Sequence, residues 1–137
     1  MSKVSVDNFN RILTAELPSA AENGIYARAI EAGKAELVLP YSERSLRPGG
    51  TIAGPFMMLL ADVCMYAVVL SLLGEIKLAV TTSLNINFLR KPGQGELVGR
   101  GSSIKLGKRL AVIEVSIYSE DEIVAHATGT YSIPPQA

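Results

Sequence analysis

The chain has 137 residues, the size of one domain, and we expect residues 1–137 to form a single unit. The 13 Lys and Arg residues balance 13 Asp and Glu residues, so the formal net charge is zero and general nucleic-acid binding is not supported. A hydrophobic share of 48% supplies enough apolar side chains for a sizeable core. The single cysteine excludes an internal disulfide, which is typical of a reducing cytoplasm.

The first third of the chain predicts one helix and two strands. Residues 6–17 carry apolar side chains at helical spacing and are followed by Pro18, so we expect an N-terminal helix within residues 1–20. Two short segments, 25–30 and 34–39, are predicted to be strands because turn residues bound them.

An apolar run over residues 56–73 is the stretch around which the rest of the chain is organised. It follows a glycine-rich turn, and Pro55 occupies the first helical turn, where proline is well tolerated. The run is too long for a strand, so we expect a helix over 54–73, ended by Gly74. A helix that is apolar all round must be covered on every side, and a curved sheet together with a second copy would cover it.

The same run is long enough to suggest a membrane span. Asp62 near its middle would cost about 2.5–3.5 kcal/mol at the bilayer centre, and the flanking charges show no positive bias. The neighbouring strands also need a core element. We therefore interpret the run as a core helix, expect no membrane partner and, because the N-terminus lacks the apolar core of a signal peptide, predict a cytoplasmic location.

After Gly74 the apolar period changes to two, which predicts strands. Their short connections predict antiparallel pairing, and we expect a four-strand meander over residues 78–133. Three glycines in the second strand region, Gly99, Gly101 and Gly107, indicate curvature or a close backbone approach. The predicted fold class is α+β. The four strands are expected over residues 80–89, 96–106, 111–117 and 123–133.

Gly54 and Asp62 are candidate catalytic groups. The first N–H groups of a helix have no intrahelical partner, and Gly54 would let a carbonyl approach them, so that they stabilise an oxyanion. Asp62 lies eight residues further on, roughly on the same side of the helix, and its carboxylate could attack a carbonyl or activate water. The spacing leaves a second interpretation open, in which Asp62 is hydrogen-bonded inside the fold or across an oligomer interface.

Three segments resemble the hotdog-fold acyl-CoA thioesterases of the PaaI-like, phenylacetate-degradation group. They are 50–55 (GTIAGP), 60–62 (LAD) and 81–92 (TTSLNINFLRKP), and the resemblance covers about residues 35–133. It implies a curved antiparallel sheet wrapped around a central helix, with homodimers that commonly form homotetramers. It also implies hydrolysis of an acyl-CoA, including aryl-acyl groups, with no cofactor and no metal.

The resemblance also implies roles for single residues. The Gly54 N–H would form the oxyanion hole, Asp62 would be the nucleophile or general base, and Thr81 would orient water. Active sites in the family lie at the dimer interface, so Gly54 and Asp62 can act from different subunits.

The sequence departs from the family motif at three positions. Ala53 stands in place of the motif His, Pro55 in place of the second motif Gly, and Arg47 in place of the motif Asn. We expect these residues, and Met58 near Asp62, to lie beside the substrate. Arg47 could bind an acidic acyl group or a CoA phosphate, or it could be a solvated loop residue.

Other basic residues stand at or beside strand ends, where they could bind CoA phosphates or be solvated. They are Arg90, Lys91, Lys105, Lys108 and Arg109. The only histidine, His126, has no partner in a catalytic motif and is predicted to be a surface or interface residue, and Cys64 is predicted to be inert core. No spacing of ligand residues predicts a metal site.

Two other functions remain open. A non-catalytic hotdog protein that binds an acyl-CoA is favoured by the missing motif His and Asn. A hotdog dehydratase or hydratase would usually need a well-placed His, which Ala53 and the remote His126 do not supply.

Overall fold

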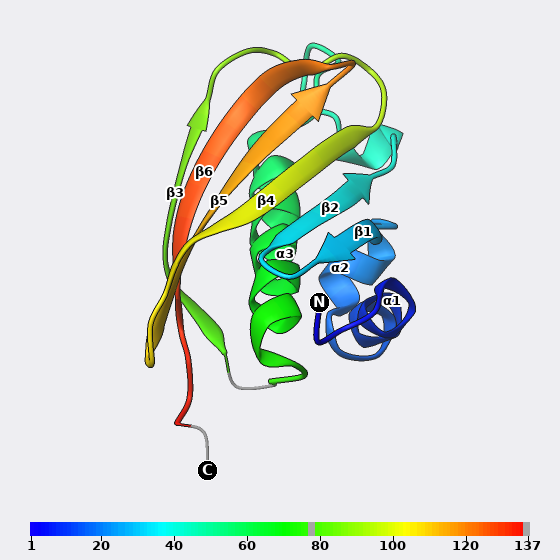
Figure 1. Cartoon of the computed structure of the whole chain (residues 1–137). Coiled ribbons are helices and arrows are strands. Elements are labelled where there is room, and N and C mark those ends of the chain that lie inside the picture. The colour runs from blue at the N-terminus through cyan, green and yellow to red at the C-terminus, as the bar shows by residue number, and fades with distance from the viewer. Residues whose placement is uncertain (77–78, 136–137) are drawn as a thin grey trace.

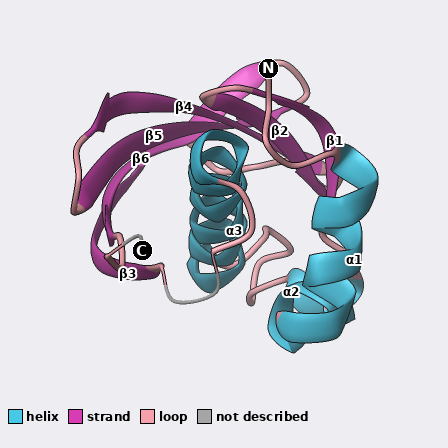
Figure 2. Ribbon diagram, turned by 60° about the horizontal axis from the view of Figure 1, so that its bottom comes forward, coloured by secondary structure: helices cyan, strands magenta, loops and turns pink. Residues whose placement is uncertain are grey.

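The computed structural model describes residues 1–76 and 79–135, so residue 78, where the predicted meander begins, and the last two residues lie outside the described part. One sheet curves around a long helix, α3, and two shorter helices pack beside them (Figure 1; Figure 2). The helices are α1 (Val6–Glu16), α2 (Pro18–Glu22), the 3-10 turn Glu43–Ser45 and α3 (Gly54–Leu73). The strands are β1 (Tyr26–Glu31), β2 (Lys34–Leu39), β3 (Val80–Phe88), β4 (Leu97–Leu106), β5 (Leu110–Ser119) and β6 (Glu122–Ser132).

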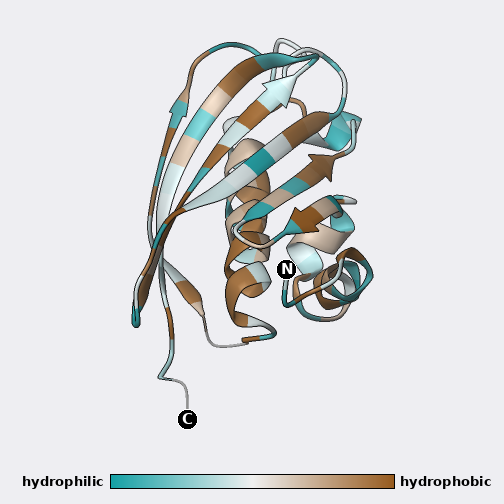
Figure 3. Ribbon diagram, in the orientation of Figure 1, coloured by the Kyte–Doolittle hydropathy of each residue, from teal (hydrophilic) through white to brown (hydrophobic). Residues whose placement is uncertain are grey.

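Helix α3 is the core element, as the apolar run predicted. By length and composition it could cross a membrane, but most of this helix is buried inside the fold. Leu60, Cys64 and Val68 are fully buried beneath the concave face of the sheet. Along each strand, successive side chains point to opposite faces of the sheet, and the apolar ones face α3. The changing colour along β4, β5 and β6 in Figure 3 shows this alternation of hydrophobic and hydrophilic residues.

The strand order corrects the predicted four-strand meander. The order across the sheet is β1-β2-β4-β5-β6-β3, and all neighbouring pairs are antiparallel. Only β4, β5 and β6 form a meander. β4 lies between β2, which it meets at Lys34 and Ser102, and β5, so it has no free side for β3. β3 pairs with the free side of β6 instead. Period-two patterning identifies strands and their inner faces, but it does not select which strand becomes a neighbour.

Two of the predicted strand glycines allow α3 to approach the sheet closely. A methyl group on Gly101 would lie 3.0 Å from Cys64 Sγ and 3.1 Å from a Val68 methyl group, and one on Gly99 would lie 3.3 Å from Leu60. These contacts confirm the expected close approach. Gly107 differs, because it lies in the β4–β5 turn, where its N–H donates to the Leu110 carbonyl.

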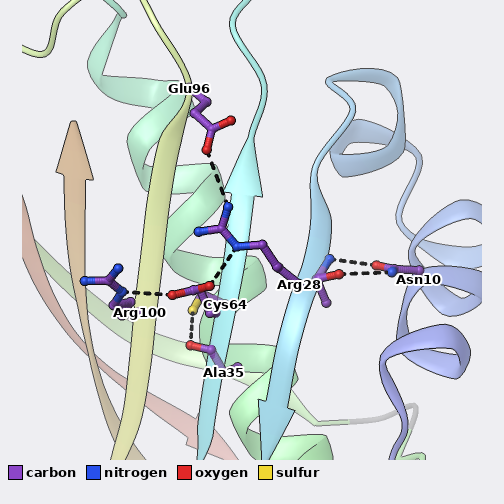
Figure 4. Close-up of polar contacts among 8 residues, drawn as sticks. Asn10, Arg28, Ala35, Cys64, Glu96 and Arg100 are labelled. Atoms are coloured by element: carbon purple, nitrogen blue, oxygen red, sulfur yellow. Dashed lines mark hydrogen bonds and ion pairs between the residues drawn. The ribbon is translucent and has the colours of Figure 1, made fainter. Parts of the chain in front are cut away.

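The two edges of the sheet differ in what covers them. Helix α1 covers the β1 edge, where the Asn10 side chain donates to the Ala27 carbonyl (3.2 Å) and accepts from the Ala27 N–H (2.7 Å; Figure 4). An edge strand is thereby paired by a side chain. At the other end, β3 has a sheet neighbour on one side only, and Val80 and Phe88 are each at least half exposed.

Ion pairs join the three strands at the α1-covered end on the outer face of the sheet. Glu36 on β2 accepts hydrogen bonds from Arg100 Nε (2.9 Å) and Arg28 Nε (2.7 Å), and both arginines are visible in Figure 4. These two bonds hold the pKa of the Glu36 carboxyl below its ordinary value. The Arg100 guanidinium also lies over the Tyr118 ring of β5, 4.8 Å from its centroid.

The packing of α3 on β4 makes Gly101 sensitive to any side chain. We expect Gly101→Val to lower the free energy of unfolding by about 1–3 kcal/mol, because the added methyl groups overlap Cys64 and Val68. Urea denaturation measures the change. Gly95→Val is the matched control, since no atom lies within 4 Å of a Cβ at Gly95. Equal effects of the two substitutions would contradict the close-packing argument.

Candidate functional site

Asp62 lies on a partly exposed stripe of α3. Pro55, Met58 and Leu59, one to two turns earlier, and Tyr66, one turn later, share this partly exposed side. The Asp62 side chain is therefore partly exposed, where a charged group can remain solvated.

Two hydroxyl groups hold the Asp62 carboxylate. Thr81 Oγ1 donates to Oδ1 at 2.6 Å, and the Tyr131 hydroxyl donates to Oδ1 and to the Asp62 main-chain carbonyl, both at 2.9 Å. Thr81 on β3 and Tyr131 on β6 are register partners, so the sheet itself places the two donors together. Among the described residues, both side-chain hydrogen bonds to this carboxylate go to Oδ1, which leaves Oδ2 for another molecule.

Tyr131 was not predicted as a site residue. Burial, followed by the negative charge of Asp62, raises the pKa of its phenol well above the ordinary value, so the hydroxyl stays protonated and keeps donating. A signal was present in the sequence: Tyr131 falls on the inward face of the last strand, where Ala125, Ala127 and Gly129 also point. A phenol on an apolar face needs a hydrogen-bond partner.

A cavity of about 490 Å³ opens beside this cluster. Asp62, Thr81 and Tyr131 all line it. Its other walls come from the C-terminal part of α1, from residues 17–20, from α3 and from residues 79–80. A substrate that fills this cavity would therefore be next to the carboxylate.

Gly54 lies in a second cavity, of about 440 Å³, at the N-terminus of α3. Three of the predicted basic residues line it as well: Arg47, Arg90 and Lys91. Arg90 is ion-paired with Glu122. The helix starts without a side-chain cap, and the Phe88 ring lies so close that a Cβ at position 54 would be 3.1 Å from it.

The structure therefore divides the predicted catalytic and substrate-binding residues into two groups. It brings Thr81 to Asp62, and it brings Arg47, Arg90 and Lys91 to Gly54. Along the axis of one helix, eight residues separate Gly54 from Asp62 by about 12 Å. Reacting groups must lie about 3–3.5 Å from their target, so these two cannot serve one carbonyl within a single chain.

The remaining predicted substrate-binding residues line neither cavity. Ala53 is the N-cap residue of α3, and Pro55 is the residue after Gly54. Met58 is exposed on α3. Lys108 and Arg109 lie in the β4–β5 turn.

The remaining nucleophile and base candidates lie away from Asp62. His126 lies 3.6 Å from Glu114 across the β5–β6 pair. Cys64 is fully buried, and burial raises the pKa of its thiol to about 12, which makes it unreactive. No cluster of potential metal ligands occurs in residues 1–76 and 79–135.

The sequence model of the thioesterase superfamily matches residues 49–126, more than half of the chain, and the chain belongs to this family. A provisionally named thioesterase from Silicibacter sp. TM1040 has a crystal structure with a TM-score of 0.89 to this one. The two are 40% identical, over 98% of this chain and 95% of the other. A provisionally named esterase from Saccharolobus solfataricus is 32% identical over 80% of this chain and 73% of its own length.

The PaaI-like resemblance is confirmed by a further structure. A mutant of the phenylacetic acid degradation protein PaaI from Thermus thermophilus is 26% identical, with a TM-score of 0.78, over 85% of this chain and 99% of the other. The matched segment 49–126 contains Gly54, Asp62 and Thr81, whereas Tyr131 lies beyond it. The fold is thus the hotdog fold of PaaI-like thioesterases.

Loss of the Tyr131 hydroxyl tests its contact with Asp62. We expect Tyr131→Phe to cost about 1–3 kcal/mol of unfolding free energy, because a buried acceptor and a carboxylate both lose a donor. Urea denaturation measures the change. The exposed Tyr41→Phe is the control, and equal effects of the two variants would contradict the assignment.

Proposed function

We propose that the protein hydrolyses an acyl-CoA thioester, with Asp62 as the general base. The observation that carries the proposal is the Asp62 carboxylate, which is fixed through Oδ1 at the wall of a substrate-sized cavity in a member of the thioesterase superfamily. Thr81 donates its own proton to Asp62, so its oxygen can accept a hydrogen bond from a water molecule held beside Oδ2.

The proposed reaction has two steps. Water adds to the thioester carbon while its proton passes to Asp62 Oδ2, and the carbonyl oxygen becomes an oxyanion stabilised by the N–H of a Gly54. The tetrahedral intermediate then expels the CoA thiolate, which takes the proton back from Asp62. The products are a free acid and CoA, and the carboxylate returns to its starting state.

We propose that a second copy of the chain supplies the Gly54 that faces each Asp62. The separation of about 12 Å within one chain supports this arrangement, and the unpaired edge of β3 offers a surface on which two sheets can join. Gly54 then contributes its N–H together with the cations around it. Arg47 and Lys91 would bind CoA phosphates, and Arg90 would do so in competition with Glu122.

Asp62→Asn tests the general base. We expect kcat for thiol release to fall by about 10²–10⁴-fold. The fold should survive, because the Asn carbonyl oxygen can still accept from Thr81 and Tyr131. Asp7→Asn, in the first turn of α1, is the control and should leave turnover unchanged.

Two outcomes would contradict the proposal. Full turnover by Asp62→Asn would remove Asp62 from the mechanism. Thermal stabilisation of the wild-type protein by acyl-CoAs, without thiol release from short, aryl or long acyl chains, would favour the non-catalytic binding protein instead.

Comparing Gly54→Pro with Gly54→Ala distinguishes the effect of losing the N–H that would stabilise the oxyanion from the effect of disturbed packing. Both add a Cβ against Phe88, but only proline removes the N–H, and Ala53 already has the extended backbone that precedes proline (ψ 145°). We expect Gly54→Pro to lower kcat by about 10²–10³-fold and Gly54→Ala to retain most activity. Equal losses in the two variants would assign the effect to packing.

Mixing the two inactive chains tests whether the site is shared. Gly54→Pro and Asp62→Asn subunits should regain up to about a quarter of wild-type activity after exchange, because a mixed dimer has one intact site. If exchange is shown by mass and no activity returns, the two residues do not act from different subunits.

A further inference from the structure

The Tyr131 hydroxyl contacts two acceptors on one and the same residue. It lies 2.9 Å from Asp62 Oδ1 and 2.9 Å from the Asp62 main-chain carbonyl oxygen. A phenol has a single proton to donate, so the two acceptors share it or take it in turn. The carbonyl belongs to the backbone of α3 and the carboxylate to a side chain. The hydroxyl therefore ties the Asp62 side chain to the helix that carries it.

Tyr131 is held more firmly than Thr81, the other donor to this carboxylate. Tyr131 is buried, and its strand β6 is paired with β5 on one side and β3 on the other (Figure 1). Its ring stacks on the Tyr66 ring of α3, with centroids 6.4 Å apart and an interplanar angle of 19°. Thr81 lies on the edge strand β3, next to a shift in the pairing register. The Tyr131 hydroxyl is thus the better-fixed reference point for the carboxylate.

The Tyr131 phenol can donate a hydrogen bond but holds on to its proton. Burial, followed by the negative charge of Asp62, raises the pKa of this phenol well above its ordinary value. An efficient general acid has a pKa near the working pH, so a role for Tyr131 as proton donor to the leaving thiolate is disfavoured. The phenol remains a hydrogen-bond donor whose acceptor can change.

A general base needs suitable surroundings both with and without its proton. As a carboxylate, Asp62 accepts a hydrogen bond from Tyr131 through Oδ1. Once Oδ2 has taken a proton, the group is neutral and Oδ1 becomes a weaker acceptor. The Tyr131 proton can then turn to the Asp62 main-chain carbonyl, which is equally close. The oxygen atoms keep their places, and the buried donor is paired in both states.

We infer that Tyr131 is a positioning residue of the reaction: it fixes Asp62 Oδ1, so that Oδ2 receives the proton of the attacking water, and it turns to the Asp62 carbonyl while that proton is held. The inference rests on the proposed function. Tyr131 gains and loses no atom in the reaction and acts through Asp62. It lies beyond the segment 49–126 that the family model matches.

Ser71→Ala is the matched control for Tyr131→Phe. The Ser71 hydroxyl is also buried and also bound to the backbone of α3, where it donates to the Val68 carbonyl at 2.6 Å. It accepts in addition from the Gly33 N–H at 2.9 Å. Each of the two variants therefore loses a buried hydroxyl and should lose stability. Of the two, Tyr131→Phe changes the surroundings of Asp62.

The kinetic test follows thiol release from hexanoyl-CoA, benzoyl-CoA or palmitoyl-CoA, whichever the wild-type protein hydrolyses fastest. We expect Tyr131→Phe to lower kcat by about 10–100-fold and to change KM by less than about threefold, because the base is misplaced while substrate binding is kept. Ser71→Ala should keep kcat within about threefold of wild type. In an Asp62→Asn background, adding Tyr131→Phe should lower kcat no further, because the base that it positions is already gone.

Urea unfolding tests the contact without any turnover. Tyr131→Phe should lower the urea midpoint more in the wild-type background than in an Asp62→Ala background. The alanine has already removed Oδ1, so the second substitution has one contact fewer to lose. The contact with the main-chain carbonyl of residue 62 is present in both backgrounds and cancels in the comparison.

Each part of the inference has its own contradicting result. An unchanged kcat of Tyr131→Phe, or an equal loss in Ser71→Ala, overturns the positioning role. A loss that adds in full to that of Asp62→Asn does so as well, because it assigns the effect to the fold. Equal urea shifts in the two backgrounds overturn the contact with Oδ1. If the urea shifts differ but the wild-type protein releases no thiol from the three acyl-CoAs, the hydrolase proposal is overturned and the contact stands.

Discussion

The close contact between α3 and the concave face of the sheet is the constraint on which the rest of the structure depends. Gly99 and Gly101 on β4 remove the side chains that would hold the helix away. The helix can then bury most of its surface, and Asp62 lies on a stripe that remains partly exposed. The packing that stabilises the fold thus also selects which side of α3 is available for chemistry.

The position of Asp62 follows from this packing, and its orientation follows from the strand order. Because β3 crosses to the free side of β6, Thr81 lies opposite Tyr131, and both hydroxyl groups reach the same carboxylate oxygen. A meander with β3 next to β4 would not place this pair together. The strand order therefore fixes the Asp62 carboxylate through Oδ1 and leaves Oδ2 without a side-chain donor among the described residues.

The two cavities have opposite chemical character. One is apolar with acidic groups at Asp62, and the other carries Arg47, Lys91 and the start of α3. An acyl-CoA has the matching division, since its acyl chain is separated from its phosphates by a long linker. The thioester lies where the two parts join, and in the proposed dimer the second copy of the chain would bring the two kinds of cavity to the same thioester.

The sequence by itself determined the local features. The apolar run predicted α3 over 54–73, period-two patterns predicted the inner faces of β5 and β6, and Gly99 and Gly101 predicted a close approach. A single charge in an apolar helix was enough to mark Asp62 as a candidate catalytic residue. These features depend on neighbours in sequence or on a single helix or strand period.

Only the tertiary structure decided which distant residues meet. The partner of β3, the contact of Tyr131 with Asp62 and the separation of Gly54 from Asp62 depend on long-range pairing, which local patterns do not encode. The eight-residue spacing placed Gly54 and Asp62 on roughly one side of a helix but could not indicate that their cavities are different. The N-terminal helix was recognised as amphipathic, yet its anchoring by Asn10 and its place beside Asp62 emerged only from the packed fold.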